Sequence, residues 1–157
     1  MTQTIQLTRG YVALVDDEDY EKLSKHKWRS APRGNRCYAF RTVGPRNAQA
    51  TILLHRVIMG APDGLVVDHI NGNTLDNRKE NLRLCTTAQN GFNQGFQKNN
   101  TSGYKGVSYC KDTGKWQARI TAEGKKYKLG RFHTPKEAYD AYCIAAKQLH
   151  GEFARLV

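Results

Sequence analysis

The sequence predicts an α+β protein made of two small domains, and three observations carry that prediction. The chain has 157 residues, enough for one ordinary domain or for two small ones with thin cores. Short apolar runs bounded by turn residues predict strands along most of its length. The polar stretch 93–102 has almost no apolar content, so it predicts a linker between a strand-rich first part and a second part that ends in a helical pattern.

The charge of the chain indicates an anionic partner. There are 25 Lys and Arg residues against 14 Asp and Glu, for a formal net charge of +11, and this balance favours a nucleic acid. A membrane partner is not expected, because we find no long apolar run, no basic amphipathic helix and no secretory signal at Met1. We therefore expect a protein of the cytoplasm. The four cysteines are scattered, which predicts reduced, packed thiols.

The first region, Thr4 to Met59, predicts a strand-rich extension. Residues 11–15 and 37–40 have strand patterns, and 30–35 form a loop with Pro and Gly. The acidic stretch 16–21 predicts the first turn of a short helix. Four arginines of this region either follow the backbone of a nucleic acid or are ordinary solvated charges: Arg33, Arg36, Arg41 and Arg46.

The middle region, from Leu65 to about Gln94, predicts the order strand, loop, strand, helix. Two apolar runs flank a loop that is rich in Asp, Asn and His. Its motifs follow one another in this order: Val67-Asp68-His69-Ile70-Asn71-Gly72, Asp76-Asn77-Arg78, Glu80-Asn81-Leu82-Arg83 and Asn90.

Metal-assisted cleavage of a phosphodiester needs few groups, and this region contains them. A hard cation requires oxygen ligands, water requires a base, and the base requires a donor that orients it. Asp68 and Asn90 can supply the oxygens, His69 the base and Asn81 the orienting contact. The alternative is a strand-end turn whose asparagines only stabilise the loop backbone. Composition alone leaves both interpretations open.

The third region predicts a sheet with one helix across it. Residues 104–109, 115–120 and 126–132 have strand patterns, separated by the turns 112–114 and 123–124. A helix is predicted to begin after Thr134. Thr134 and the Glu three residues later form a capping box, and Pro occupies the first helical position. Its apolar positions recur at helical spacing up to the cap at Gly151: Ala138, Ala141, Tyr142, Ala145, Ala146 and Leu149.

Much of the positive charge lies in this third region. Residues 98–157 contain 12 Lys and Arg against 5 Asp and Glu, which is +7 of the total +11. Strand alternation places Trp116, Ala118 and Ile120 on one face and Lys115, Gln117 and Arg119 on the other. Either Trp116 belongs to the core and the lysines only solvate the surface, or the sheet lies in a DNA groove.

Three motifs of the third region resemble the AP2 domain over Ser102–Leu156. They are Tyr-Lys-Gly-Val, Gly-Lys-Trp and Leu-Gly-Arg-Phe, and an Ala-rich helix follows them. In that family a three-stranded sheet lies in the major groove, and Arg and Trp side chains contact bases and phosphates. Ser108 and Lys128 replace Arg and Trp of the family, so a plant-type target sequence does not carry over. The resemblance implies these DNA contacts: Lys105, Ser108, Lys111, Trp116, Arg119, Lys126 and Lys128.

The middle motifs resemble the HNH endonucleases of phages and homing introns. In that family two strands and a helix hold one divalent metal, the ββα-metal fold. The resemblance implies Asp68 and Asn90 as metal ligands, His69 as general base and Asn81 in the central Asn role. Many members have His at the last position; an amide oxygen there favours Mg²⁺, with Mn²⁺ as the alternative, over a zinc-type site.

Two further residues lie near these motifs. Arg83 follows on the second strand, where it either clamps a phosphate or is plain surface. His55, in Leu54-His55-Arg56-Val57, is expected to be a structural histidine that caps a local carbonyl.

The sequence thus predicts two domains with one joint function. Residues 1–95 form the nuclease domain, with its ββα-metal core at about 65–95; 96–102 form a linker, and 103–157 form the AP2-like domain. The two resemblances imply a metal-dependent endonuclease that cuts double-stranded DNA as a monomer or homodimer, with the AP2-like domain adding site binding. Such an enzyme would be a phage or mobile-element homing nuclease in the cytoplasm of a bacterium or a phage-infected host cell. The alternatives are a non-catalytic, sequence-specific DNA-binding regulator with a relic nuclease domain, and a protein that binds or cleaves RNA.

Overall fold

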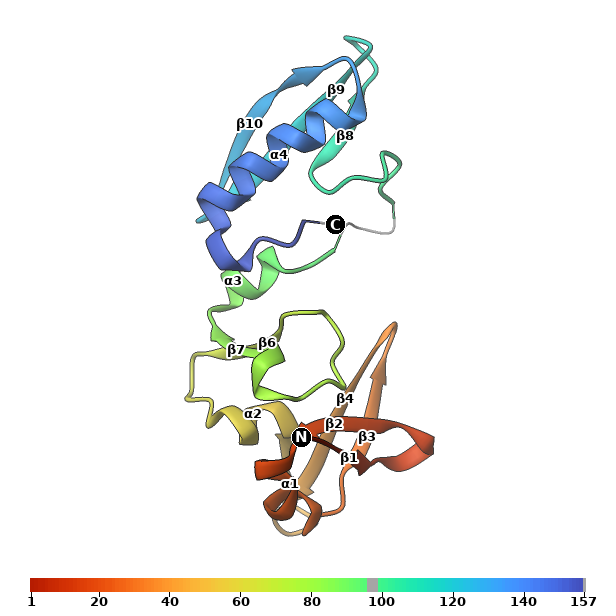
Figure 1. Cartoon of the computed structure of the whole chain (residues 1–157), viewed down its shortest axis with the longest axis vertical. Coiled ribbons are helices and arrows are strands. Elements are labelled where there is room, and N and C mark those ends of the chain that lie inside the picture. Colours follow the sequence, from red (N-terminus) through yellow and green to blue (C-terminus); the bar gives the residue numbers. More distant parts are fainter. Residues whose placement is uncertain (96–98, 157) are drawn as a thin grey trace. The chain divides into compact units, whose positions relative to one another are not determined.

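The computed structural model describes residues 1–95 and 99–156, which divide into two compact units (Figure 1). The first unit is Met1–Thr87 and the second is Ala88–Val157. This division falls ahead of the predicted domain end at residue 95. Residues 96–98 of the predicted linker lie outside the described residues. The predicted domain boundaries therefore stay a prediction, and each unit is described by itself.

The first unit begins with a hairpin. β1 (Thr2–Gln6) pairs antiparallel with β2 (Val12–Asp16) through the short 3-10 turn η1 (Thr8–Gly10). Helix α1 (Asp17–Ser24) follows directly. It has three carboxylates in its first turn, where their negative charge stabilises the helix by interacting with the positive end of the helix dipole. The acidic stretch therefore opens a helix, as the sequence predicted.

A three-stranded sheet and a short helix complete the extension. The antiparallel order is β3 (Arg29–Arg33), β4 (Arg36–Val43), β5 (Ala50–Leu53), and α2 (Leu54–Met59) follows. One buried apolar cluster joins the hairpin, α1, the sheet and α2, so the extension is a packed scaffold: Ile5, Leu7, Ala13, Val15, Leu23, Trp28, Ala39 and Leu54.

The middle region has the predicted order of elements. β6 (Val66–His69) pairs antiparallel with β7 (Leu82–Cys85), and the intervening loop ends in the 3-10 turn η2 (Lys79–Asn81). Helix α3 (Thr87–Phe92) then begins at the boundary of the two units.

The second unit contains a three-stranded antiparallel sheet and one long helix. The sheet order is β10 (Lys125–Phe132), β9 (Lys115–Ala122), β8 (Val107–Cys110), and α4 (Pro135–His150) leads into the turn η3 (Gly151–Phe153). The predicted capping box is present: Thr134 Oγ1 accepts from the Glu137 amide at 3.2 Å, and the Glu137 carboxylate accepts from the Thr134 amide at 3.3 Å.

Helix α4 covers one face of this sheet. Ile120 packs with Tyr142, Ala145 and Ala146, and a neighbouring cluster joins β8, β9 and α4. Gly106 makes this packing possible, because a Cβ there would lie 2.2 Å from the Tyr142 ring and the residue has φ +74°. The predicted α+β class is confirmed. Within the described residues, no helix is long and apolar enough to cross a membrane.

Candidate active site

Asp68 and His69 lie at the end of β6, and both are buried. The antiparallel register places Asp68 opposite Arg83 on β7. Arg83 Nε and Nη2 donate to Asp68 Oδ2 at 2.9 and 2.7 Å. Pairing of the two strands therefore brings three of the predicted site residues together.

The imidazole of His69 contacts Asn77, a partner that the sequence motifs did not predict for it. His69 Nε2 lies 3.4 Å from Asn77 Oδ1. Asn77 is fully buried, and its Nδ2 donates to the Leu75 carbonyl at 3.0 Å, so its amide oxygen faces the histidine. Because an amide oxygen only accepts, this contact favours the tautomer with the proton on Nε2 and leaves Nδ1 as the basic nitrogen.

The surroundings of His69 keep it neutral. Burial lowers the pKa of His69, because the charged imidazolium loses hydration. The Asn77 hydrogen bond and the carboxylates of Asp68 and Asp76 oppose this shift, and the positive charge of Arg36 adds to it. The net direction is downward, which suits a general base at neutral pH.

Asn81, the predicted orienting residue, closes the loop between the two strands. Its Nδ2 donates to the Asp76 carbonyl at 2.8 Å, and its Oδ1 accepts from the Asn71 amide at 2.9 Å. The Ile70 amide donates to the Asn81 carbonyl at 2.9 Å. The Asp76 carboxylate in turn binds Asn71 and Arg78. These bonds hold the loop, and the loop presents Asn77 to His69.

The N-terminal extension also holds this loop, which runs beside β4 (Figure 1). The Leu14 amide donates to the Leu75 carbonyl, and the Asn77 amide donates to the Leu14 carbonyl, both at 2.8 Å. Thr74 Oγ1 donates to the Cys37 carbonyl at 2.6 Å and accepts from the Cys37 amide at 3.1 Å. These contacts could not be predicted from the sequence, because main-chain partners do not depend on residue type.

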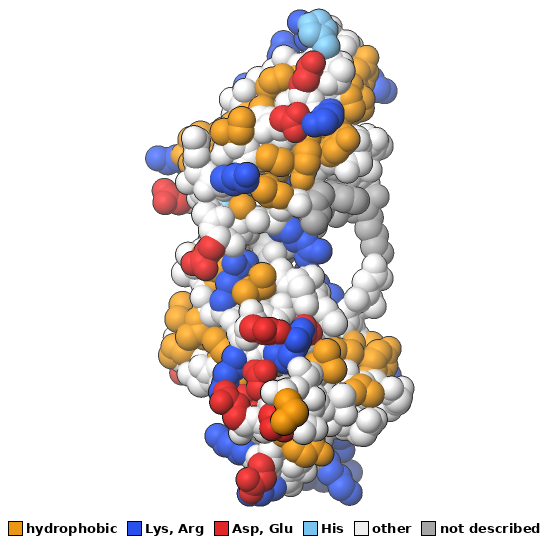
Figure 2. Space-filling model, in the orientation of Figure 1, with side chains coloured by type: hydrophobic (Ala, Val, Ile, Leu, Met, Phe, Trp, Pro, Cys, Tyr) orange, Lys and Arg blue, Asp and Glu red, His pale blue; other side chains and the backbone are white. Residues whose placement is uncertain are grey.

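Ion pairs fasten the end of the loop to α1. The Lys79 amide donates to the Asp16 carboxylate at 2.7 Å, and the Lys79 ammonium pairs with Glu18 and, at 3.1 Å, with Asp19. Figure 2 shows carboxylates and cations side by side on the first unit. Solvent screens such exposed pairs and makes them weak, so the buried amides contribute most to the order of this loop.

His55 differs from its predicted role. Its ring lies edge-on to His69, with centroids 5.1 Å apart at 87°, and contacts Tyr38 at 5.8 Å. Its Nδ1 is buried and has no hydrogen-bond partner among the described residues, so this nitrogen does not cap a carbonyl. Burial lowers the pKa of His55 to about 3. His55 is therefore a neutral packing partner of His69.

Asn90, the second predicted metal ligand, lies one turn into α3 and is half-buried. Within the described residues, no three or more His, Cys, Asp or Glu side chains cluster as a metal site. The predicted donor set contains one carboxylate and one amide, so it would not form such a cluster. Its hard oxygens suit Mg²⁺ chemically. The role of Asn90 as a metal ligand stays a prediction.

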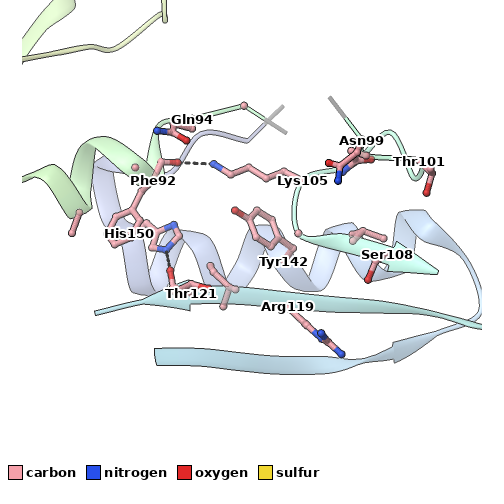
Figure 3. Close-up of a pocket in the computed structure, with 17 residues that line it drawn as sticks. Phe92, Gln94, Asn99, Thr101, Lys105, Ser108, Arg119, Thr121, Tyr142 and His150 are labelled. Atoms are coloured by element: carbon pink, nitrogen blue, oxygen red, sulfur yellow. Dashed lines mark hydrogen bonds between the residues drawn. The ribbon is translucent and has the colours of Figure 1, made fainter. Parts of the chain in front are cut away.

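In the second unit, Lys105 points away from the predicted DNA interface. Its ammonium donates to the Phe92 carbonyl at 2.6 Å, and burial lowers its pKa to about 8. Phe92 stacks on His150 with ring centroids 3.8 Å apart, and His150 Nε2 lies 2.9 Å from the Thr121 carbonyl. These residues line a pocket of about 650 Å³ (Figure 3). The Lys105 ammonium thus binds α3 in this structure, and its assignment as a DNA contact stays a prediction.

Trp116, another predicted DNA contact, is partly buried. It packs against Val107, Ala118 and Ala138 on the face that α4 covers, and its assignment as a DNA contact stays a prediction. Alternation places Arg119 on the opposite face, and Figure 3 shows its side chain leaving β9 away from the pocket.

The face of the sheet opposite α4 is basic. Arg119 lies opposite Lys128, Lys126 lies opposite Thr121, and Ser108 lies opposite Gln117. The register of β10 shifts after Lys128, so Arg131 lies opposite Gln117 and shares this face. We name this surface the outer face: Ser108, Gln117, Arg119, Thr121, Lys126, Lys128 and Arg131. Lys111 is exposed in the turn that follows β8.

Two family models match the chain in the two regions that the motifs indicated. The HNH endonuclease model matches residues 53–92, and the AP2 domain model matches residues 102–152. Both resemblances predicted from the sequence are therefore confirmed. Together they support a nuclease with a DNA-binding domain.

Known proteins resemble the chain over different lengths. Protein 3.8 of Escherichia phage T7 is 39% identical over 94 residues, which are 60% of this chain and 77% of that protein. The uncharacterized HNH endonuclease L560 of Acanthamoeba polyphaga mimivirus is 30% identical over 147 residues, 93% of this chain and 74% of that protein. The AP2-like ethylene-responsive transcription factor AIL5 of Arabidopsis thaliana is 38% identical over 76 residues, 47% of this chain and 13% of that protein. No solved structure matches the chain.

Proposed function

Since the chain belongs to the HNH endonuclease family, we propose that it is a metal-dependent endonuclease that hydrolyses phosphodiester bonds of double-stranded DNA. The observation that carries the proposal is a buried His69 whose Nε2 faces Asn77 and whose neighbour Asp68 is paired with Arg83. The similarity of the chain to a phage protein and to a giant-virus protein supports a role as a homing or other mobile-element nuclease.

In the proposed reaction His69 Nδ1 takes a proton from a water that attacks the phosphorus. The new bond joins the water oxygen to phosphorus, and the bond from phosphorus to the 3′ oxygen breaks, with the leaving oxygen departing in line. Asn77 keeps the imidazole oriented and its Nε2 protonated. Asp68 and Asn90 would hold the divalent metal, most simply Mg²⁺, which when bound stabilises charge on the phosphate and on the leaving oxygen. Arg83, beside Asp68, would contact the phosphate.

The outer face of the C-terminal sheet is proposed to bind the DNA site. Arg119, Lys126 and Lys128 supply charge on one surface, and Ser108 and Lys111 lie on or beside it. The basic charge and the exposed position of these groups support groove binding. Arg131 joins this set because of the irregularity in β10.

The proposal is tested by conversion of supercoiled plasmid to nicked or linear product with Mg²⁺. We expect His69→Ala to lower the cleavage rate by at least about 100-fold, because the base is lost, with unchanged mobility shift of bound DNA. His26→Ala is the matched control, since His26 is an exposed histidine of the same unit. A chelator should abolish cleavage by the wild type. Nicked product would indicate a monomer that cuts one strand per encounter.

A specific result would replace this function. If the wild type shifts DNA but leaves the plasmid supercoiled with Mg²⁺ and Mn²⁺ on several DNA sources, the protein is a DNA-binding regulator. The cations of the outer face favour that second candidate, because they need no catalysis to bind DNA.

A further inference from the structure

The β3–β4 hairpin carries two like charges that face one another. The register pairs Arg33 directly with Arg36 across the turn 34–35, and both arginines are exposed. Like charges in directly opposed positions repel each other. Among the described residues, neither arginine forms an ion pair with an Asp or Glu. An anion bound between them would remove this repulsion.

Strand β4 connects this pair to the candidate active site. Strand β5 pairs only with residues 40–43 of β4, which leaves the edge at Cys37 to bond with Thr74 of the loop. One residue further, the Tyr38 ring lies 6.3 Å from the His69 ring, centroid to centroid. The strand thus runs from the hairpin turn directly to the proposed base.

Strand geometry places Arg36 at the rim of the site. Residues two apart on a strand share a face and are separated by about 7 Å, so Arg36 follows Tyr38 on the side where Tyr38 meets His69. The hairpin lies within the first unit, and the HNH family model begins only at residue 53.

We propose that the β3–β4 hairpin is a second DNA-binding element, in which Arg33 and Arg36 bind backbone phosphates next to the phosphate that is cleaved at His69. The proposal rests on the proposed nuclease function for the position of the cut. A guanidinium binds phosphate through two parallel hydrogen bonds, and two of them side by side match an anionic backbone. Such contacts position the DNA and carry no sequence information.

The test measures DNA binding without cleavage. Full-length protein with His69→Ala is titrated with duplex DNA at several salt concentrations. We expect Arg33→Ala and Arg36→Ala each to reduce the slope of log affinity against log salt by about 0.9, which is one phosphate contact. Hydroxyl-radical footprinting should show lost protection at phosphates beside the cut made by the wild-type protein. Arg36→Lys should retain most of the slope, because the charge remains.

Arg46→Ala is the matched control. Arg46 is exposed in the loop after β4, at the end of the strand far from the hairpin turn, so its removal takes away one charge from the same sheet without changing the footprint near the cut. The thermal midpoints of Arg33→Ala and Arg36→Ala should not fall below that of the parent protein, because each substitution relieves the repulsion between the pair.

Different results separate the two proposals. If both hairpin variants keep the parent salt slope and footprint, the hairpin inference is wrong, even when wild-type cleavage supports the nuclease. The hairpin inference is also wrong if Arg46→Ala reduces the salt slope as much as Arg33→Ala and Arg36→Ala do. If the wild type cuts no DNA while the hairpin variants lose slope, the nuclease proposal fails and the hairpin remains a DNA-binding element.

Discussion

The loop around His69 and the outer face of the C-terminal sheet are both polar, but they are built in opposite ways. In the loop, buried amides and carboxylates bind one another and the main chain, as Asn77 and Asn81 do. On the outer face, Arg119 and Lys128 are exposed to water. A buried polar group must be satisfied by specific partners, whereas an exposed cation acts mainly through its charge.

This difference predicts how substitutions will behave in each region. In the loop each side chain holds another, so one change should alter the geometry of His69 and its effects should not be additive. On the outer face the cations act through their charge, so the loss of affinity should follow the charge removed and should weaken with salt. The two regions therefore call for different measurements: cleavage rate for the loop and salt-dependent affinity for the face.

Among the residues that support the proposed base, the largest effect is expected at Asn77. Asn77→Ala removes the oxygen that faces His69 Nε2 and the amide bond to Leu75, so the imidazole loses its fixed orientation. Removal of such a supporting contact typically lowers activity by about 10–100-fold, and we expect the upper end of that range. The measurement is the single-turnover cleavage rate at saturating protein, with DNA affinity unchanged.

Asn47→Ala provides the control for that substitution, since Asn47 is an exposed asparagine of the same unit. A cleavage rate for Asn77→Ala within twofold of wild type would show that the loop does not orient the base.

A smaller effect is expected from two cations of the outer face. Arg119 and Lys128 lie opposite each other on β9 and β10, and their joint replacement by Ala should remove two phosphate contacts. We expect roughly tenfold weaker binding at physiological salt and a salt slope lower by about 2, with an unchanged cleavage rate at saturating protein. The measurement is fluorescence anisotropy with labelled duplex across a salt series.

The control removes two cations from the helix side of the same unit. Lys136 and Lys147 are exposed on α4. If their joint replacement by Ala weakens binding as much as the outer-face pair does, DNA binding follows total charge and the outer face has no special role.

Local patterns explain why the fold class and both families could be predicted. The capping box at Thr134 needs only residues that lie close together in sequence, and so does the alternation that separates Arg119 from Ala118. The HNH motifs are likewise recognised by order and spacing, which the chain displays directly.

Contacts between distant residues explain what the sequence could not reveal. Asn77 faces His69 because the loop is bonded to Leu14, some sixty positions earlier, whereas spacing alone favoured Asn81. Lys105 turns toward Phe92 because α3 packs in the second unit. Arg131 joins the basic face only because β10 is irregular after Lys128, and strict alternation would place it on the opposite side.

The smallest effect sharpens the contrast between buried and exposed polar groups, and it concerns His55. Its pKa is lowered from the usual 6.5 to about 3 by burial and by the nearby His69 and Arg56. The unfolded chain therefore binds a proton at this residue that the folded protein excludes. Its contribution to stability is complete above pH 6.5 and is lost as the pH falls toward 3. Through His55, a fall from pH 7 to pH 6 should lower the free energy of unfolding by about 0.7 kcal/mol.

His55→Gln should remove the part of the acid-induced loss of stability that is due to His55. The pKa values of His69 and His150 are also lowered, so these residues should still contribute their own parts. Urea unfolding at pH 7 and pH 6 measures the difference for wild type and variant, and His26→Gln at an exposed site should behave as wild type. If the variant keeps the whole acid sensitivity of the wild type, His55 is protonated in the folded protein. The site would then hold a charged imidazole beside His69. A buried charge there would not need specific partners of the kind that Asp68 and Asp76 have in Arg83 and Arg78.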